Sequence, residues 1–483
     1  MFSFSEIEER LVNSKQEHLL QHWGKLTSEE RECFLQQLSA IDFEYMNEIF
    51  WNATNFRHET PKKLDTRMSP IPSARYEVAD RVSRAVLAEY RTIGLKEISE
   101  DHVAVILLAG GQGTRLGVTY PKGMFPIDIP SGKTLFQLQA ERIRRVIELA
   151  EEETGRQGKI CWYIMTSAAT HESTANYLEK HEYFGIHKED VVLFQQASLP
   201  CFTFSGKIIL EKKDSIALAP DGNGGIYEAM QKHKIVADMQ RRGVKYVHVY
   251  SVDNILVKVA DPEFIGYCVK KEADCGVKVI PKRIPNEPVG VVCEVDGVFQ
   301  VVEYSEISEV TASQRNRLGE LVFNAGNICN HLFTTDFLEN MSEVNADELD
   351  LHVAQKKIPF IGDNLEIIRP TDPNGIKIEK FIFDAFKFSL NFVVWEVPRC
   401  TDFSPLKNCD NTSRDCPATC RRDLLKLHKR YVQRAGGVVV CDELEISPLL
   451  SYAGENLEEI VRGKQFFSKT LLVSKSEQSN NES

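Results

Sequence analysis

The feature that most constrains the fold is a series of five apolar segments spread over residues 102–282. They read HVAVILLAG, KICWYIMTS, DVVLFQQ, VKYVHVYSVDN and DCGVKVIPK, and their nearly continuous apolar character predicts strands buried on both faces. Residues 133–150, 171–181, 225–242 and 261–271 predict helices between these strands. The alternation predicts an α/β fold with a Rossmann-like, mixed but mainly parallel sheet, whose ligands bind beyond the carboxyl ends of the strands.

The flanking segments predict an organisation in three parts. We expect a helical N-terminal region over residues 1–100, where Thr27-Ser28-Glu29-Glu30 is a capping-box signal. A central domain over 101–405 carries the ligand site, and within it the alternation around Asp296-Gly297 predicts a hairpin at a mixed edge of the sheet. A small C-terminal domain over 406–483 ends in the polar stretch SKSEQSNNES, which we expect to be disordered.

The charge balance restricts the kind of partner. A net charge of -12 disfavours nucleic acid and anionic membranes, so an anionic ligand must be held by a few focused lysines and arginines. No apolar run approaches the length that crosses a bilayer, and the first residues are acidic where a signal peptide needs an apolar core. We therefore expect a cytoplasmic protein with reduced thiols.

Four cysteines, Cys400, Cys409, Cys416 and Cys420, lie close together in the sequence. Their spacing contains no paired C-x-x-C and matches no standard zinc finger. A thiol-bearing surface segment is therefore favoured over a zinc site.

A glycine-rich loop follows the first apolar segment, in LAGGQGTRLGVTYPKGMFPID. A Walker A loop needs glycine where Ile127 stands, five residues before Gly132-Lys133-Thr134, and a dinucleotide loop needs a third glycine where Leu116 stands. Both motifs also place phosphate on a helix N-terminus, and the prolines that follow oppose such a helix. These prolines are Pro121, Pro126 and Pro130.

The remaining solution is an extended loop that lies over a polyphosphate. Glycines allow close approach of the backbone, so its N–H groups can contact phosphate oxygens. Arg115 and Lys122 are spaced so that the returning chain can bring both cations to the same ligand.

Gly111-Gln112-Gly113-Thr114-Arg115-Leu116 followed by Pro121-Lys122 resembles the signature of sugar nucleotidyltransferases. The further motifs APDGNGG, VDNILVKVADP, EPVGVVCEVDG, VVEYSE, FNAGNI, PNGIKIEKFIFD and FSPLKN extend the resemblance, in order, to the eukaryotic UDP-N-acetylhexosamine pyrophosphorylases over residues 100–410. The resemblance implies a GT-A-like nucleotidyltransferase domain that joins UTP and N-acetylglucosamine 1-phosphate and releases pyrophosphate, with Mg²⁺. Use of N-acetylgalactosamine or glucose 1-phosphate stays open, as does a homodimer.

The same resemblance implies the site residues. The catalytic cations are Arg115, Lys122 and Lys377, and Asp253 is the magnesium ligand, with Asp221 a weaker candidate. Ser251 stands where many members of the family carry cysteine. The substrate-binding positions are Leu108, Ala109, Gly110, Gly111, Gln196, Gly222, Asn223, Ser251, Gly290, Glu303, Tyr304, Asn327, Phe381, Phe383 and Lys407.

Individual roles also follow from the resemblance. Gln196 reads uracil, because a carboxamide both donates and accepts hydrogen bonds. Glu303 and Tyr304 bind sugar hydroxyls, while Gly290 and Asn327 form the walls of the N-acetyl pocket. Phe381 and Phe383 lie beside the acetyl methyl group, although aromatic residues at this spacing are more often simply core. The last two are alternating residues of EKFIFDAF.

Two other classes of function are disfavoured. An NAD(P)-dependent oxidoreductase needs a helix at the glycine loop and an acidic residue at the tip of the next strand, which here ends in IMTSAATHE. A scaffold that had lost catalysis would not be expected to keep a cation at every predicted phosphate contact.

Overall fold

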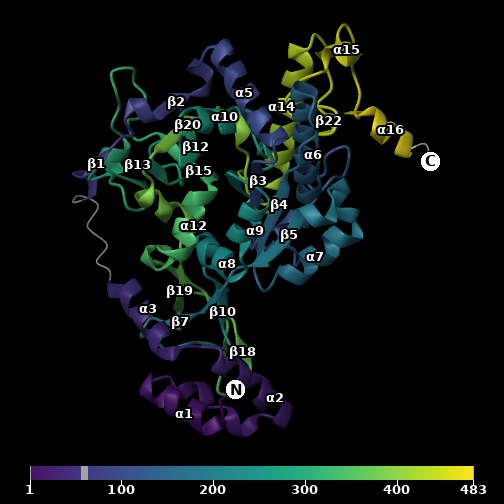
Figure 1. Ribbon diagram of the computed structural model, residues 1–483. Helices are drawn as coiled ribbons and strands as arrows, with labels where there is room; N and C mark the ends of the chain where they lie inside the picture. The colour runs from purple at the N-terminus through teal and green to yellow at the C-terminus, as the bar shows by residue number, and fades with distance from the viewer. Residues whose placement is uncertain (1, 56–63, 482–483) are drawn as a thin grey trace. The chain divides into compact units, whose positions relative to one another are not determined.

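The computed structural model describes residues 2–55 and 64–481, which fall into two compact units (Figure 1). The first unit comprises residues 1–59, 196–229 and 345–384, and the second comprises 60–195, 230–344 and 385–483. The three-part division expected from the sequence stays a prediction. None of the described helices combines the length and apolar character that crossing a bilayer requires.

The second unit is built on a sheet in the strand order β2-β20-β12-β15-β11-β3-β4-β5. Strands β3, β4, β5 and β11 are parallel neighbours, as are β2, β20 and β12, whereas β15 runs antiparallel between β11 and β12. The prediction of a mixed, mainly parallel sheet is therefore confirmed. The bounds are β2 Tyr76–Val78, β3 Val103–Leu108, β4 Cys161–Thr166, β5 Val191–Gln195, β11 Tyr246–Ser251, β12 Cys275–Pro281, β15 Ala325–Thr334 and β20 Phe392–Glu396.

A hairpin extends the sheet at β15. Strands β13 (Val291–Val295) and β14 (Val298–Val302) pair antiparallel, and the turn residues Asp296 and Gly297 both have positive φ, which is typical of a tight hairpin turn. Val291 of β13 pairs with Gly326 of β15. The hairpin predicted from Asp-Gly is thus confirmed.

Helices pack against the sheet, and their aromatic side chains contribute to the hydrophobic core. Helix α6 (Leu135–Thr154) is capped by Thr134, whose side chain accepts from Gln137 N–H, and its Phe136 lies edge-on to Trp162 of β4. Tyr90 of α5 (Arg84–Ser99) packs against Tyr267 of α10 (Pro262–Lys270). Helix α7 (His171–Lys180) follows β4, and the stretch expected as one helix over 225–242 is two, α8 (Ile226–Lys232) and α9 (Ile235–Arg241). Lys234 separates them because its φ is 54°.

The C-terminal segment shares a core with the glycine loop. Helix α14 (Pro417–Arg434) supplies Leu424 and Leu427 to a cluster that also contains Leu116 and Ile127. Short strands complete this part: β21 (Val438–Val439), β22 (Leu444–Ile446), β23 (Gln465–Phe466) and β24 (Thr470–Leu472).

Two expectations for the C-terminal part are wrong. The tail was expected to be disordered, but Lys475–Asn481 forms helix α16, because Glu477 pairs with the buried Lys133 at 2.8 Å and hydrogen-bonds Ser447 Oγ at 2.7 Å. The clustered thiols were expected at the surface, yet Cys416 and Cys420 are buried because they start α14, which packs into the core. Cys400 is exposed and Cys409 is half-buried.

The first unit joins helices α1 (Phe4–Asn13), α2 (Ser28–Ser39) and α3 (Phe43–Asn55) to a set of short strands. The capping box at Thr27 is confirmed: Glu30 N–H donates to Thr27 Oγ1 at 3.2 Å, and Thr27 N–H donates to Glu30 Oε2 at 2.9 Å. Strand β19 (Gly375–Glu379) pairs antiparallel with β16 (His352–Lys356) and with β7 (Phe202–Thr203). Phe34, Phe43, Phe202 and Ile376 belong to the core of this unit.

Candidate active site

In the second unit, the glycine loop doubles back on itself without forming an α-helix. After β3 the chain makes two short 3-10 turns, Thr114–Leu116 and Lys122–Met124, and the next α-helix begins only at Leu135. Gly113 N–H donates to Tyr120 O at 3.2 Å, and Lys122 N–H approaches Gly111 O at 3.4 Å. Gly111 and Lys122 are thereby brought side by side, as the sequence predicts for a loop that lies over a ligand.

Most backbone polar groups at the start of this loop are already hydrogen-bonded within the protein. Ala109 N–H donates to Met165 O at 2.8 Å, Val252 N–H donates to Leu108 O at 3.2 Å, and Ser167 Oγ–H donates to Gly110 O at 2.8 Å. Gly111 is exposed. The backbone groups of this stretch that could still contact a ligand are therefore the Gly110 N–H and the backbone of Gly111.

Three cations at or near the glycine loop are not neutralised by the described part of the protein. Within residues 2–55 and 64–481, the side chains of Arg115, Lys122 and Lys407 have no ion-pair or hydrogen-bond partner. By contrast, Lys133 pairs with Glu141 at 2.6 Å and Lys258 pairs with Asp402 at 3.4 Å. Unpaired cations around a glycine loop are the arrangement that an anionic ligand requires.

Lys407 and Asp253 are held together by their backbones. Leu406 N–H donates to Asp253 O at 2.8 Å, and Ile255 N–H donates to Ser404 O at 3.2 Å. Because β11 and β3 are in register at Ser251 and Leu108, this pair lies at the same edge of the sheet as the glycine loop. Among the residues that the structure describes, the Asp253 carboxylate has no hydrogen-bond or ion-pair partner.

A side chain that the sequence did not single out, Asn254, fixes this arrangement. Its Nδ2 donates to Asp402 O at 2.7 Å, and its Oδ1 accepts from Ser404 N–H at 3.0 Å. Asp402 is buried and pairs at 3.1 Å with Lys278, a fully buried lysine of β12 that also pairs with Asp261. Burial opposes ionisation of Asp402, but the lysines around it hold its pKa below the ordinary value. Sequence offers little signal for such a set, because its members are far apart along the chain.

The predicted sugar-binding residues of the second unit also come together. Asn327 N–H donates to Gly290 O at 2.9 Å. A Cβ placed on Gly290 would lie 3.0 Å from Glu303 Oε1 and 2.7 Å from Val301 Cγ1, so the carboxylate of Glu303 closely adjoins this glycine. Tyr304 is half exposed, with 50% of its surface accessible. A wall of glycine, carboxylate and amide suits hydroxyl and acetamido groups.

In the first unit, Gln196 is held by Asp221 and the loop that follows it. Gln196 Nε2 donates to Asp221 Oδ1 at 2.7 Å and to Gly222 O at 2.8 Å. Both amide hydrogens are therefore engaged within the protein, and the carboxamide can offer a ligand only its Oε1 acceptor. That acceptor matches the N3–H of uracil, while a donor for O4 must come from another group.

Asp221 is an unusual carboxylic acid. It is buried, and burial raises its pKa to about 6 against the hydrogen bond from Gln196, which lowers it. A carboxylate that is buried and already accepts from Gln196 is less suited to Mg²⁺ than Asp253 is.

The DGNGG loop is bonded to the segment after β19. Gly224 N–H donates to Lys380 O at 2.8 Å, Lys380 N–H donates to Asp221 O at 2.7 Å, and Ile382 N–H donates to Asn223 Oδ1 at 3.0 Å. Gly222 has φ of +88°, and a Cβ on Gly224 would lie 2.6 Å from the Lys380 carbonyl carbon. These glycines are therefore required by close packing of two backbones.

Phe381 and Phe383 lie in the same segment, with ring centroids 5.0 Å apart. His352, which sequence reasoning missed, packs at a tilt against Phe381 with ring centroids 4.3 Å apart, and it hydrogen-bonds Asp384 Oδ2 at 2.9 Å. Phe383 is buried and Phe381 half-buried, so the first is core and the second keeps an exposed face. Lys377 of β19 has no ion-pair or hydrogen-bond partner within the described chain, and it alternates with the buried Ile376 and Ile378.

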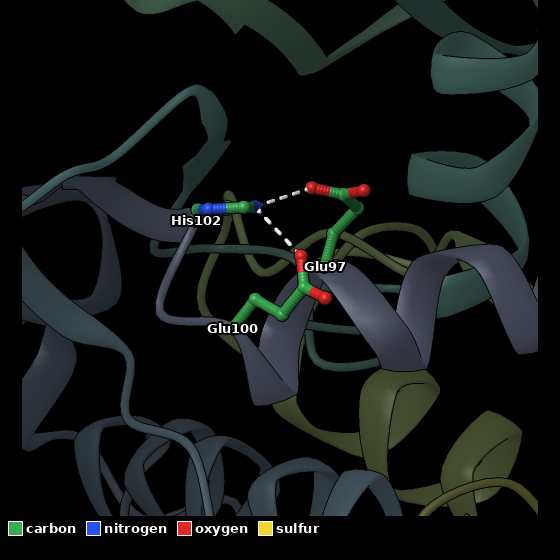
Figure 2. A group of neighbouring side chains, drawn as sticks. All are labelled: Glu97, Glu100 and His102. Atoms are coloured by element: carbon green, nitrogen blue, oxygen red, sulfur yellow. Dashed lines mark hydrogen bonds and ion pairs between the residues drawn. The ribbon is translucent and has the colours of Figure 1, made fainter. Parts of the chain in front are cut away.

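A cluster of one histidine and two glutamates within the described residues also has ligand atoms close enough to hold a metal, but it lies elsewhere. In Figure 2 one ring nitrogen of His102 faces the carboxylates of both Glu97 and Glu100. The distances from His102 Nδ1 to the two carboxylate oxygens are 2.7 and 3.4 Å. His102 immediately precedes β3, whereas the glycine loop follows that strand. The group is therefore at the opposite end of the strand from the candidate active site.

Comparison with known proteins identifies the family to which the chain is similar. The model of the UTP–glucose-1-phosphate uridylyltransferase family matches residues 49–468. The human UDP-N-acetylhexosamine pyrophosphorylase-like protein 1 is 48% identical over 98% of this chain and 97% of its own length. The UDP-N-acetylglucosamine pyrophosphorylase of Saccharomyces cerevisiae is 39% identical over 98% of this chain and 100% of its own length.

A solved structure agrees with these relatives. The uridine diphosphate N-acetylglucosamine pyrophosphorylase of Trypanosoma brucei, determined with an inhibitor, is 31% identical, has a TM-score of 0.80 and covers 95% of both chains. The helix-free glycine loop and its unpaired cations occur in a chain that matches these proteins almost end to end. The chain belongs to the UTP–glucose-1-phosphate uridylyltransferase family.

Proposed function

We propose that this protein joins UTP and N-acetylglucosamine 1-phosphate to form UDP-N-acetylglucosamine and pyrophosphate. The observation that carries the proposal is the set of cations without a protein partner, Arg115, Lys122 and Lys407, at the edge of the sheet that also presents the glycine loop and Asp253. The relatives named above, by their names, act on the same class of substrate. N-acetylgalactosamine 1-phosphate is a second acceptor that we propose to test.

The chemistry is an in-line displacement at the α-phosphorus of UTP. A phosphate oxygen of the sugar phosphate forms the new P–O bond, and the bond between the α-phosphorus and its bridging oxygen to the β-phosphate breaks. The electron pair of that bond leaves with pyrophosphate. The attacking phosphate is mostly dianionic near neutral pH, because its second pKa is about 6, so no general base has to remove a proton.

The protein residues would therefore act by positioning and by neutralising charge. Arg115 and Lys122 would hold the β- and γ-phosphates, which become the leaving group. Lys377 and Lys407 would neutralise the remaining phosphate oxygens, and Gln196 Oε1 would accept from uracil N3–H. Gly290, Glu303 and Asn327 would orient the sugar.

The donor set fits one magnesium ion. Asp253 offers a hard carboxylate oxygen that no described protein group already uses, and Mg²⁺ usually takes one or two carboxylates together with substrate phosphates. Bound Mg²⁺ would supply charge neutralisation at phosphate oxygens. A cytoplasmic location and a homodimer stay predictions.

The test compares Lys122→Ala with Lys180→Ala, the removal of an exposed lysine from α7. Pyrophosphate release is measured with UTP, Mg²⁺ and each of N-acetylglucosamine, N-acetylgalactosamine and glucose 1-phosphate. We expect Lys122→Ala to lower turnover by about a hundredfold or more, as loss of a transition-state contact does, and Lys180→Ala to match the wild type. Near-normal turnover of Lys122→Ala would remove its assigned role, and no turnover of the wild type with any of the three sugar phosphates would refute the proposed function.

A further inference from the structure

A second cationic pocket lies beside α14, in the second unit and apart from the glycine loop. It is a cavity of about 340 Å³ lined by Arg283, Arg399, Lys426, Lys429 and Arg430, with Asp423 as the one carboxylate among its lining residues. Five cations facing one carboxylate are unexpected in a chain whose net charge is -12. Mutual repulsion of the cations makes this pocket costly unless an anion enters it.

Most of these charges are not neutralised by the protein. Arg399 pairs with Glu287, and Asp423 is already engaged by Arg422 at 3.1 Å and by Ser404 Oγ–H at 3.0 Å. Within the described chain, the side chains of Arg283, Lys426 and Lys429 have no ion-pair or hydrogen-bond partner. Among the described residues, the Arg430 guanidinium donates only to the carbonyl oxygen of Cys400.

The two half-buried arginines are also incompletely satisfied. Arg399 Nε and Arg430 Nε are both buried without a hydrogen-bond acceptor among the described residues. Buried polar groups normally find a partner, and both of these nitrogens belong to arginines that line the same pocket. Burial lowers the pKa of the Arg399 guanidinium, and the neighbouring charge of Arg283 acts in the same direction.

A neighbouring cavity connects this pocket to the candidate active site. This second cavity, of about 420 Å³, shares Arg283, Arg399, Phe403 and Asp423 with the first and is also lined by Lys407. Lys407, Arg283 and Arg399 line this route together with the carboxylates of Glu287, Asp415 and Asp423.

We propose that the pocket beside α14 is a second binding site for pyrophosphate, used as this product leaves Arg115 and Lys122 and passes Lys407. The inference rests on the proposed function for the identity of the anion. A volume of about 340 Å³ is at the lower end of the range of ligand pockets, which suits a small anion rather than a nucleotide sugar. Two linked phosphate groups can contact cations on both walls, and charge-assisted hydrogen bonds to phosphate are among the strongest available to arginine.

The experiment counts pyrophosphate bound to the full chain by isothermal titration calorimetry, without UTP or sugar phosphate. The wild type should bind two pyrophosphates, and Lys426→Gln/Lys429→Gln should bind one, with the lost site weakened by roughly tenfold or more. Glutamine preserves helix propensity, so α14 should remain intact. The matched control is Arg434→Gln/Lys464→Gln, which removes two exposed cations that line neither cavity and should still bind two.

Lys122→Ala separates the two proposals. If it weakens one site while Lys426→Gln/Lys429→Gln weakens the other, both proposals stand. If Lys122→Ala changes neither site but the double variant still removes one, the pocket beside α14 stands and the catalytic assignment fails. The inference would be overturned if the double variant still bound two pyrophosphates. It would also be overturned if the wild type bound only one and Lys122→Ala abolished that binding. Titration with inorganic phosphate should give binding at least tenfold weaker at the α14 site, because one phosphate cannot reach both walls; equal affinity would contradict the choice of pyrophosphate.

Discussion

Replacing Asp221 by asparagine should stabilise the first unit above pH 6. The substitution keeps an oxygen that can accept from Gln196 Nε2 and removes the buried negative charge. Burial raises the pKa of this carboxyl from 3.8 to about 6, so the folded state binds the proton more tightly than the unfolded state does. The difference between the two pKa values, at about 1.4 kcal/mol per pKa unit, amounts to about 3 kcal/mol.

The sign of the pH dependence follows from linkage. Because the folded-state pKa is raised, the contribution of Asp221 to stability is present in full below pH 3.8 and is lost as the pH rises through 6. Asparagine does not titrate. The difference in the free energy of unfolding between variant and wild type should therefore grow by up to about 3 kcal/mol from pH 4 to pH 7.5.

Hydrogen exchange of the backbone amides of residues 196–229 measures this difference locally, which matters because two units need not unfold together. A difference that is the same at pH 4 and pH 7.5 would refute the raised pKa.

Three further substitutions test separate parts of the structure. Gln196→Ala should raise KM for UTP more than KM for the sugar phosphate, by roughly fivefold to tenfold for one lost hydrogen bond. Steady-state rates with UTP and CTP measure the selectivity, and an unchanged preference for UTP would contradict the assigned role of Gln196. Gly224→Ala should lower the stability of the first unit by about 1–3 kcal/mol in urea unfolding, because its Cβ would lie 2.6 Å from the backbone of Lys380; an unchanged midpoint would contradict the close packing. Lys278→Met should cost about 3 kcal/mol or more, since it leaves Asp261 and Asp402 buried with fewer partners, and a loss below about 1 kcal/mol would show that Lys258 suffices.

Local signals accounted for much of the fold. Apolar runs located β3, β4, β5, β11 and β12, and the Asp296-Gly297 turn located the hairpin, because each signal is contained in a few neighbouring residues. Strand β15 was not predicted, although it is central in the sheet. Polar residues such as Asn330 and His331 interrupt the apolar pattern that identified the other strands. Its antiparallel direction depends on pairing with strands distant in the sequence.

The candidate site likewise contains features that the local sequence predicted and features that it did not. Glycines and prolines around Arg115 and Lys122 were sufficient to exclude a helix after β3, because their conformational restrictions are local. The burial of Asp221 and the contact of Lys278 with Asp402, 124 residues away in the chain, could not be read in advance. Such contacts depend on the assembled sheet rather than on any neighbouring residue.

The hydrophobic cluster that joins Leu116 and Ile127 to Leu424 and Leu427 means that the middle of α14 and the first turn of the glycine loop should unfold together. A chain shortened before Pro417 would expose the inner side of the glycine loop to water, so no amino-terminal fragment ending there should retain nucleotide affinity. Variation in the carboxyl-terminal segment is thereby constrained by the packing of the glycine loop, even at buried positions such as Leu424.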